Sequence, residues 1–314
     1  MKKILITGAS GFIGSHLART LSRRDRVHVW LRPTSNTWRL RDVLSNVRVH
    51  YVDITDSAAV WSSIGEVKPD VIYHTANVGV YAGIPTSSLM DAVNRVGFTN
   101  LIEAASATSC SAFINIGSVS EYGPKNTPMS EDDVCEPVTE YGRSKLAATL
   151  AAVQLGESGF PIATFRLFSP YGPFDDERRI IAKTILSIAS GTMMWLPSER
   201  LVRDYLFVED AIDFLAEVSG HIKYHAGEIF NLSGGAEIRA IDVMREIARE
   251  MGKEISWPKK DVPLEAESPT VQADMSKTFS AFPWRPKVPL ETGITKTIDW
   301  FVREYPAIRP AHSR

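Results

Sequence analysis

The feature that most constrains this chain is a strand–turn–helix pattern at residues 3–17, KILITGASGFIGSHL. A short β-rich run enters a turn that holds Gly8, Gly11 and Gly14, and an apolar helical pattern follows. Glycine lets the backbone turn sharply and approach a pyrophosphate without a Cβ in the way. The N–H groups at the start of the helix then attract the phosphates. The pattern predicts a dinucleotide site; a glycine-rich turn without a ligand is the alternative.

Short apolar runs alternate with helical patterns through the first half of the chain. The predicted strands are residues 4–7, 27–31, 47–52, 71–74, 112–117 and 162–167, and the predicted helices are 13–23, 58–64, 89–106 and 141–155. This alternation predicts an α/β fold, a Rossmann-type doubly wound parallel sheet with helices on both faces. Ligands of such sheets bind beyond the carboxyl ends of the strands, where Gly8, Asp53 and Ser118 fall.

After residue 167 prolines become frequent and the predicted elements become shorter. We therefore predict two domains. The Rossmann domain comprises residues 1–168 plus about 205–235, and a smaller, less regular substrate-binding domain comprises residues 169–204 and 236–314. A strand–helix pair near residues 205–218 and a strand at 229–232 are expected to rejoin the sheet.

The composition argues against several functional classes. Lysine and arginine (35) nearly balance aspartate and glutamate (37), so no basic face predicts nucleic-acid binding. No apolar run approaches the roughly 20 residues of a membrane span, and no signal-peptide pattern is present. The two cysteines, Cys110 and Cys135, suit a reducing cytoplasm. His221 and His225 are four residues apart, but without further ligands we expect no metal site.

The end of the second predicted strand indicates which nicotinamide cofactor binds. An acidic residue there accepts hydrogen bonds from the ribose of NAD, whereas an arginine accommodates the extra phosphate of NADP. Arg32 stands at this point, no carboxylate precedes Asp42, and Arg39 offers a second cation. NADP is therefore the predicted cofactor and NAD the alternative. Asp53 is placed to bind the adenine amino group, or to cap the helix that follows.

Three residues suggest the chemistry. Tyr141 and Lys145 stand four apart at the start of a helical stretch, so both project from one face. A neighbouring ammonium group lowers the pKa of a phenol and so prepares it for general acid–base work. Ser118 ends the fifth predicted strand and can donate a hydrogen bond to a carbonyl oxygen. A solvated Tyr–Lys pair is the alternative, but the order of glycine turn, serine, tyrosine and lysine favours catalysis.

With these residues in place, the chain resembles the extended short-chain dehydrogenase/reductase family, specifically its nucleotide-sugar branch. The resemblance covers nearly the full length and includes TGASGFIG, VDITD, HTAN, VNRVGFTNLIEAA, NIGSVSEYG, YGRSK, FRLFSPYGP and RDYLFVEDA. It implies a Rossmann domain with a small substrate domain, a nucleotide-sugar substrate and a homodimer. It also implies that Ser118, Tyr141 and Lys145 form the catalytic triad, and that Arg203 clamps the substrate diphosphate. An ion pair with Asp204 or Glu209 is the alternative role for Arg203.

Together with the resemblance, these patterns give two predicted sets of site residues. The predicted cofactor contacts are Gly8, Ser10, Gly11, Phe12, Ile13, Gly14, Arg32, Arg39, Asp53, Ile54, Thr75, Ala76, Asn94, Tyr141, Lys145 and Phe168. The predicted substrate contacts are Asn77, Ser118, Ser120, Ser169 and Arg203.

Departures from the family pattern narrow the reaction. Dehydrating members carry an Asp-Glu pair directly after the serine, where this chain has Val119 and Ser120. Decarboxylating members use a glutamate at Ser120, and 3,5-epimerising reductases need a cysteine there and a histidine at Phe174. Ser169 replaces the usual asparagine, and residues 264–267 hold no counterpart of a second nucleotide-binding arginine, which argues against UDP as the nucleotide.

Three hypotheses remain. The first is an NADPH-dependent reductase acting at C4 of a 4-keto-6-deoxysugar nucleotide, with Tyr141 as the general acid. The second is an NAD-dependent nucleotide-sugar 4-epimerase. The third is a non-catalytic member that senses nucleotide redox state, which has little physical reason to keep Ser118, Tyr141 and Lys145 together.

Overall fold

The structure, a computed structural model, describes all residues except 80–85, 197–198, 259–269 and 309–314. Residues 264–267, where the sequence offered no second arginine, therefore lie outside the described residues. The chain divides into two units, which are described separately. The first contains Met1–Gly123, Val134–Leu167 and Ile212–Phe230; the second contains Pro124–Asp133, Phe168–Ala211 and Asn231–Arg314.

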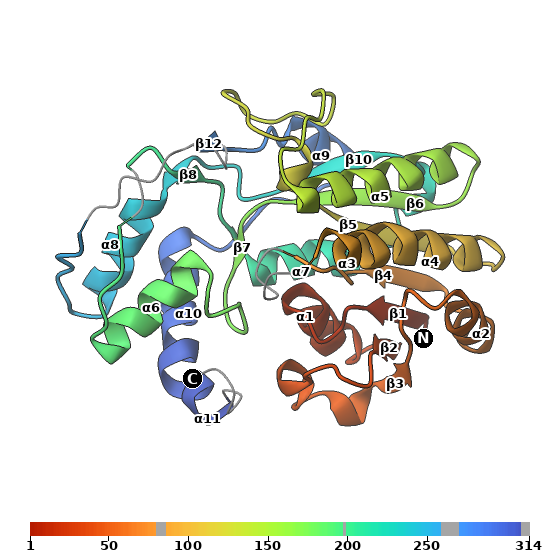
Figure 1. The fold of residues 1–314 in the computed structure, drawn as a ribbon, viewed down its shortest axis with the longest axis horizontal. Coiled ribbons are helices and arrows are strands. Elements are labelled where there is room, and N and C mark those ends of the chain that lie inside the picture. Colours follow the sequence, from red (N-terminus) through yellow and green to blue (C-terminus); the bar gives the residue numbers. More distant parts are fainter. Residues whose placement is uncertain (80–85, 197–198, 259–269, 309–314) are drawn as a thin grey trace. The chain divides into compact units, whose positions relative to one another are not determined.

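The first unit is built on a seven-stranded sheet with the order β10-β6-β5-β4-β1-β2-β3 (Figure 1). The strands are β1 (Lys3–Thr7), β2 (Arg26–Leu31), β3 (Arg48–Tyr51), β4 (Val71–His74), β5 (Ala112–Ser118), β6 (Ile162–Leu167) and β10 (Ile229–Leu232). The pairs β1–β2, β1–β4, β2–β3, β4–β5 and β5–β6 are all parallel. This confirms the predicted Rossmann-type parallel sheet, with strand ends that move by only one residue.

The order of strands reverses beside β1, which is hydrogen-bonded to β2 on one side and to β4 on the other. Thr7, the last residue of β1, is in register with Trp30 of β2 and with His74 of β4. In open α/β sheets a reversal of this kind leaves a crevice at the carboxyl ends of the two strands. The glycine turn after Thr7 and the loop after His74 therefore share the place where a ligand is expected.

Helices cover both faces of this sheet. They are α1 (Phe12–Leu21), α2 (Ser57–Val67), α3 (Ser87–Asp91), α4 (Gly97–Ser106), α5 (Glu140–Glu157) and α7 (Val208–Val218). Leu5, Ile72 and Phe113 of the strands pack into one buried core with residues of α2, α4 and α5. On the opposite face the Tyr73 hydroxyl donates to the carbonyl of Leu215 in α7 at 2.9 Å. Successive strand residues point to opposite faces, which explains why strands covered on both sides are apolar throughout.

The predicted helix over residues 89–106 is interrupted. The structure has α3, then a π-helical turn over Ala92–Val96, then α4. Asn94 lies in this turn, and its buried side chain bonds to groups outside the helix. Single π-helical turns of this kind are rare and are frequently found at functional sites.

The second unit holds two small sheets and several helices. Strands β7 (Pro170–Tyr171) and β9 (Leu206–Phe207) form one sheet, and β8 (Val202–Arg203), β11 (Ile238–Arg239) and β12 (Thr270–Val271) form the other. The helices are α6 (Ile180–Ser190), α8 (Ala240–Glu250), α9 (Ser276–Ala281), α10 (Leu290–Asp299) and α11 (Tyr305–Ile308). The prediction that the strand near residue 205 rejoins the main sheet is wrong, because β9 pairs with β7; β10 does join it.

The buried carboxylate of Asp204 holds segments of the second unit together. It is fully buried and accepts hydrogen bonds from the backbone N–H groups of Gly235, Ala236 and Ala273, at 2.8, 3.2 and 3.1 Å. A buried carboxylate needs such donors, because an unpaired charge away from water is very costly. One side chain thus fixes two other segments of the second unit, Gly235–Ala236 and Ala273, to the segment that carries Asp204.

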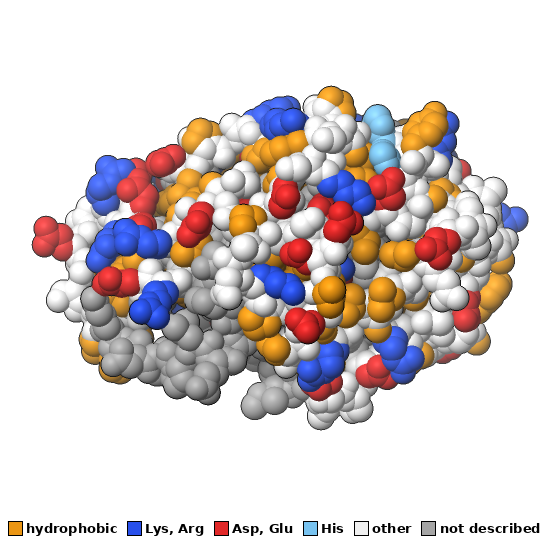
Figure 2. Space-filling model, turned by 90° about the horizontal axis from the view of Figure 1, so that it is seen from above, with side chains coloured by type: hydrophobic (Ala, Val, Ile, Leu, Met, Phe, Trp, Pro, Cys, Tyr) orange, Lys and Arg blue, Asp and Glu red, His pale blue; other side chains and the backbone are white. Residues whose placement is uncertain are grey.

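No helix in the described part of the chain is long and apolar enough to cross a membrane. Figure 2 shows acidic and basic side chains interspersed on the face that it draws, with no area of a single sign. This mixture matches the near balance of charges in the sequence.

Candidate active site

The turn after β1 needs its glycines for two different reasons. Gly8 has a φ of +69°, and a Cβ there would lie 2.5 Å from the backbone nitrogen of Ala76. A Cβ on Gly14 would lie 2.4 Å from the carbonyl oxygen of Gly8. The turn therefore packs backbone against backbone, with the start of α1 on one side and the loop after β4 on the other.

A small hydrogen-bond network holds these two segments together. The Thr75 hydroxyl donates to the carbonyl oxygen of Thr7 at 2.7 Å, and the hydroxyl of Thr7 lies 2.8 Å from Nδ1 of His74. Burial, together with the nearby charge of Lys145, lowers the pKa of His74 to about 3, so this imidazole is neutral at physiological pH. The predicted cofactor residues Gly8, Thr75 and Ala76 are thus brought together by neutral groups.

Helix α1 begins in a way that suits an anion. Its N-cap is Gly11, which has no side chain to cap the helix, and no acidic residue lies in the first turn. The first N–H groups of an α-helix have no partner within the helix. Those of Phe12, Ile13 and Gly14 therefore lie at the positive end of α1, next to the glycine turn. This arrangement, with backbone packing that a Cβ would block, fits the pyrophosphate of a dinucleotide.

The end of β2 carries the predicted phosphate-binding arginines. Arg32 is exposed, and its backbone N–H donates to the hydroxyl of Ser35 at 2.9 Å. The guanidinium of Arg39 lies over the ring of Trp38, 4.3 Å from its centroid. The first carboxylate after the strand, Asp42, pairs with Arg19 at 2.7 Å. The residue directly after β2 is thus an arginine with an exposed side chain, and the nearest following carboxylate already has a partner.

Asp53 follows β3 and is exposed, and its Oδ1 accepts from the backbone N–H and the hydroxyl of Thr55 at 2.9 and 2.8 Å. The alternative in which Asp53 caps α2 is wrong, because Asp56 does so through the N–H of Ala59. Ile54 is buried; its carbonyl accepts from Asn100, and a Cβ on Gly97 would lie 2.6 Å from its Cγ2. The side chain of Ile54 therefore supports α4, while Asp53 stays accessible.

Asn94 was predicted to contact the cofactor, and the structure gives its amide another use. Its Oδ1 accepts from the N–H of Val78, and its Nδ2 donates to the carbonyl of Val78 and to the hydroxyl of Ser144. The side chain is 2 % exposed. Asn94 therefore ties the loop after β4 to α5, the helix that carries Tyr141 and Lys145.

Ser118 ends β5 and caps a short 3₁₀ turn over Val119–Glu121. Its Oγ accepts from the backbone N–H of Ser120 at 3.2 Å, and its own N–H donates to the carboxylate of Glu121 at 2.7 Å. These two bonds form a capping box. The predicted catalytic hydroxyl is thus held on a fixed turn at the carboxyl end of the sheet.

Helix α5 packs directly on this turn. A Cβ on Gly142 would lie 2.3 Å from the carbonyl oxygen of Ser120, so only glycine permits this approach. Tyr141 precedes it and is half-buried, near the loop after β4: a Cβ on Gly79 would lie 3.8 Å from its ring. Lys145 is buried, and its Nζ donates to the carbonyl of Ile116 in β5 at 2.6 Å. The first turns of α5, which carry Tyr141 and Lys145, therefore lie against the end of β5, where Ser118 is.

The environment of Lys145 affects its charge. Burial lowers the pKa of Lys145, and the negative charge of Glu121 opposes that shift. An ammonium with a lowered pKa gives up a proton more easily, and a charged one stabilises a neighbouring phenolate. Both properties suit a lysine that assists proton transfer by Tyr141.

Asn77, a predicted substrate contact in the first unit, is exposed, and its amide donates to the carbonyl of Thr75 at 3.2 Å. Three predicted site residues belong to the second unit. Phe168 is fully buried, and Ser169 and Arg203 are half-buried. The carboxylates considered as partners of Arg203 are engaged elsewhere: Asp204 by backbone N–H groups and Glu209 by Lys296 at 2.6 Å.

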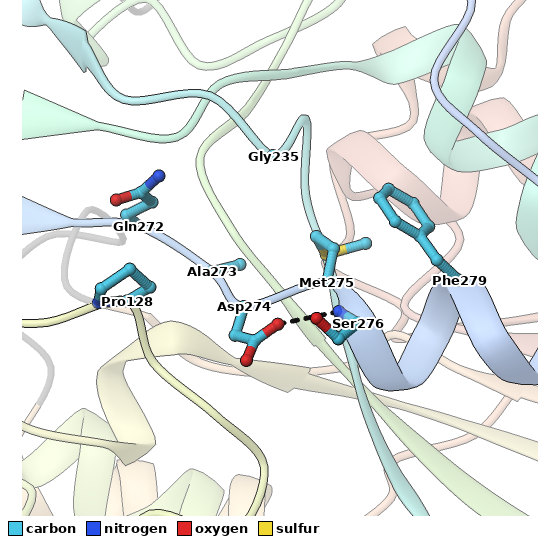
Figure 3. Close-up of a pocket in the computed structure, with 8 residues that line it drawn as sticks. All are labelled: Pro128, Gly235, Gln272, Ala273, Asp274, Met275, Ser276 and Phe279. Atoms are coloured by element: carbon cyan, nitrogen blue, oxygen red, sulfur yellow. Dashed lines mark hydrogen bonds between the residues drawn. The ribbon is translucent and has the colours of Figure 1, made fainter.

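The second unit also has a pocket of about 350 Å³ on its surface. It is lined by Pro128, Gly235, Gln272, Ala273, Asp274, Met275, Ser276 and Phe279 (Figure 3). The carboxylate of Asp274 accepts from the backbone N–H of Ser276 at 2.8 Å, and hydrogen bonds from Ser276 lower the pKa of Asp274. None of the predicted site residues lines this pocket.

Two charged residues at the site escaped the sequence analysis. Glu121 and Arg166 form an ion pair at 2.9 Å, with side chains 0 % and 2 % exposed. The available signal was Arg166 itself, a charge within the apolar run of a strand predicted to be buried. A charge in that position needs a partner, so a search for a nearby carboxylate would have been justified.

The histidine pair that we discounted lies at a 3₁₀ turn over Ile222–Tyr224, where Nδ1 of His225 lies 2.9 Å from Glu228. Among the described residues no group of three or more His, Cys, Asp or Glu side chains is placed to hold a metal ion.

Comparisons with known proteins agree with this geometry. Residues 4–233 match the sequence profile described as the NAD dependent epimerase/dehydratase family. The chain is 28% identical to an Escherichia coli dTDP-glucose 4,6-dehydratase, over 96% of this chain and 93% of that protein. Among solved structures, the UDP-glucose 4-epimerase of Thermus thermophilus, in complex with NAD, is 25% identical with a TM-score of 0.85; the match covers 96% of this chain and 99% of that one.

A third relative is the UDP-glucuronic acid 4-epimerase of Bacillus cereus, solved with UDP-glucuronic acid and NAD. It is 26% identical with a TM-score of 0.83, and the match covers 95% of this chain and 98% of that one. These enzymes lie in the nucleotide-sugar branch that the sequence resembled, which confirms that resemblance. The chain therefore belongs to the NAD-dependent epimerase/dehydratase family.

Proposed function

We propose that this protein is an oxidoreductase that reduces the 4-keto group of a nucleotide-linked 6-deoxysugar. The observation that supports the proposal is the packing of α5, which carries Tyr141 and Lys145, against the turn that begins at Ser118, in the unit that also contains the glycine turn. When bound, a nicotinamide cofactor supplies the hydride for such a reaction.

Residues of the chain would then supply the proton and stabilise the charge that develops on the sugar oxygen. Tyr141 protonates the alkoxide oxygen that forms at C4 of the sugar, with Lys145 stabilising the phenolate left behind. Ser118 donates a hydrogen bond to the same oxygen as its charge develops. Proton transfer of this kind contributes roughly 10²–10⁴-fold in rate. The neutral His74 at the end of β4 adds no second charge beside Lys145.

The turn after Ser118 argues against dehydration. A 4,6-dehydratase must remove water as well as transfer hydride, and that requires an additional acid and base. The two positions after Ser118 hold Val119 and Ser120, neither of which has a side chain that titrates near neutral pH. Glu121 is not a substitute, because it is fully buried and both carboxylate oxygens are bonded within the protein.

For the cofactor we propose NADP, on the evidence of the end of β2. Arg32 is exposed there, and the first carboxylate, Asp42, is neutralised by Arg19. An arginine in this position suits a 2′-phosphate, whereas an unpaired carboxylate would suit the ribose hydroxyls of NAD. We also propose a homodimer, which light scattering of the purified protein would test.

A second candidate is an NAD-dependent 4-epimerase. It is favoured by the Thermus thermophilus and Bacillus cereus relatives, both of them 4-epimerases with NAD bound. The same three residues serve this reaction, because an epimerase oxidises C4 and then reduces it again at the opposite face. Such an enzyme must retain its cofactor between the two steps.

One experiment separates the two candidates. The protein is purified without added cofactor, and one portion is denatured so that the released nucleotide can be identified. A native portion is assayed with NADPH and NADH against UDP- and dTDP-linked 4-keto-6-deoxyhexoses, and against the corresponding nucleotide-linked hexoses for 4-epimerisation. An empty protein that oxidises NADPH stoichiometrically with the keto sugar supports the reductase. Tightly held NAD⁺ with interconversion of 4-epimers supports the epimerase. Cofactor binding without turnover of any nucleotide sugar would support the third hypothesis, a non-catalytic protein that senses nucleotide redox state.

A further inference from the structure

The buried ion pair between Glu121 and Arg166 lies directly beside Ser118. One oxygen of Glu121, Oε2, accepts from Nε of Arg166 at 2.9 Å, and the other, Oε1, accepts from the backbone N–H of Ser118 at 2.7 Å. The two side chains are 0 % and 2 % exposed. Both oxygens of one carboxylate are thus used, one to hold a cation and one to hold the backbone of the predicted catalytic serine.

Arg166 is itself fixed from several directions. It lies on β6 in register with Gly117 of β5, so its side chain starts next to the residue that precedes Ser118. Its Nη2 donates to Sγ of Cys135 at 3.3 Å, and its guanidinium lies 4.3 Å from the centre of the Tyr122 ring. Burial opposes the charged form, but Glu121 and Tyr122 hold the pKa of Arg166 above its usual value. Arg166 is therefore kept charged and is held beside Glu121 by contacts on several sides.

The sequence leaves room for this pair. A Cβ on Gly117 would lie 2.8 Å from Oε1 of Glu121 and 3.2 Å from Cγ of Arg166. Gly117 lies in strand β5, in an extended conformation that any residue could adopt. Only glycine, however, leaves space here for the carboxylate of Glu121. We call the residues Gly117, Ser118, Glu121 and Arg166 the serine-turn cluster.

The serine-turn cluster determines which hydrogen bonds the Ser118 hydroxyl can make. A serine hydroxyl has one proton to donate and two sites that accept. The N–H of Ser120 occupies one acceptor site at 3.2 Å, and that contact exists because the Val119–Glu121 turn is closed by Glu121. The hydroxyl proton is left available for an outside acceptor, as a hydrogen bond to a substrate oxygen requires.

A purely stabilising role explains the pair poorly. Well-packed apolar residues of similar volume usually stabilise a fold as well as a buried ion pair does, because burying two charges is costly. A carboxylate, in contrast, can hold the backbone N–H of Ser118 and close the turn. We propose that Glu121, held by Arg166, is a positioning residue that orients the Ser118 hydroxyl toward the substrate oxygen; this inference rests on the proposed function.

The main test uses a double variant, Glu121→Leu with Arg166→Met, which removes both charges together and strands neither. It is compared with Ser118→Ala and with the triple variant. We expect kcat of the double variant to fall about 100-fold, as for a catalytic group displaced by about 1 Å. Cofactor affinity, measured by fluorescence titration, should stay at the wild-type value. In the Ser118→Ala background the same two substitutions should have little further effect, because residues that act through one another are not additive.

Hydrogen exchange provides a readout that does not depend on activity. In the wild-type protein the amide of Ser118 donates to a buried carboxylate and should exchange slowly. In the double variant, exchange in the peptide covering Ser118–Tyr122 should be much faster, while peptides of α1 are unchanged. Should the double variant not fold, Glu121→Asp replaces it: the shorter carboxylate cannot reach both partners, so kcat should fall and Ser118 should exchange faster.

Specific results would overturn the inference. A folded double variant with wild-type kcat would do so, as would an equal fractional loss in the Ser118→Ala background, which would indicate a general structural effect. Slow exchange at Ser118 in the variants would also contradict it. By contrast, wild-type activity of Ser118→Ala itself would refute the proposed function, and the exchange result would still decide whether Glu121 holds the turn.

Discussion

Substitution of Gly14 by alanine tests the glycine turn in the most direct way. A Cβ at this position would lie 2.4 Å from the carbonyl oxygen of Gly8, 2.7 Å from Oγ1 of Thr75 and 2.8 Å from Cα of Ala9. Two of these atoms belong to the backbone and cannot rotate aside. The first turn of α1 must therefore move away from the turn that precedes it.

The size of the effect can be worked out from opposing contributions. Overpacking of a tight interior contact costs about 1–3 kcal/mol. Alanine is a better helix former than glycine, which returns about 0.5–1 kcal/mol. The free energy of unfolding should thus fall by about 0–2.5 kcal/mol, with about 1 kcal/mol as the central value. Displacing the N–H groups at the start of α1 should cost one charge-assisted hydrogen bond to a phosphate, so the cofactor should bind about 10–100-fold more weakly.

The assay combines urea unfolding with fluorescence titration of NADPH and NADH. Gly65→Ala is the matched control, because Gly65 lies in α2 of the same unit and a Cβ there meets no atom within 4 Å. The control should be at least as stable as the wild type and should bind cofactor equally well. If Gly14→Ala matched the control in both measurements, the phosphate would not bind where we place it.

Three further predictions concern the chemistry, the cofactor and the response to pH. Tyr141→Phe should lower kcat by roughly 10²–10⁴-fold with unchanged cofactor affinity; steady-state kinetics and titration would check this, and wild-type turnover would reject Tyr141 as the acid. Arg32→Ser should raise the Kd for NADPH about 10–100-fold and leave the Kd for NADH unchanged. If both Kd values rose equally, Arg32 would not be the residue that binds the 2′-phosphate. Burial is the main cause of the lowered pKa values of His74 (about 3) and His28 (about 4). Because the unfolded chain takes up these protons below its normal histidine pKa of about 6.5 and the folded chain does not, stability is lost as the pH falls toward 4, by about 1.4 kcal/mol per pH unit for each histidine. Urea unfolding at a series of pH values would measure the slope, and a flat profile in that window would contradict the buried, neutral state.

The parts of the fold that follow from local patterns were predicted well. Strands β4 and β6 have the predicted ends, because short apolar runs bounded by turn residues are typical of strands buried on both faces. The π turn around Asn94 was not predicted, since it depends on bonds to Val78 and Ser144 that lie far along the chain. The pairing of β9 with β7 was likewise missed, because two-residue strands carry no periodic signal.

The candidate site shows the same division. Gly8, Ser118, Tyr141 and Lys145 were identified from their types and order, and the structure brings them to the carboxyl end of one sheet. The role of Asn94 in tying a loop to α5, and the ion pair of Glu121, depend on which residues meet in space.

The sequence by itself determined the parallel sheet, the glycine turn and the order of the predicted catalytic side chains, because each is visible in the types and spacing of residues along the chain. Only the tertiary structure decided how Ser118 is held, since Arg166 reaches Glu121 from a strand 45 residues away. Hydrophobic periodicity reports which face of an element is buried, but it carries no information on which buried polar groups become partners. Those partners are selected when the strands pair and the interior excludes water, so that each remaining charge must find its counterpart.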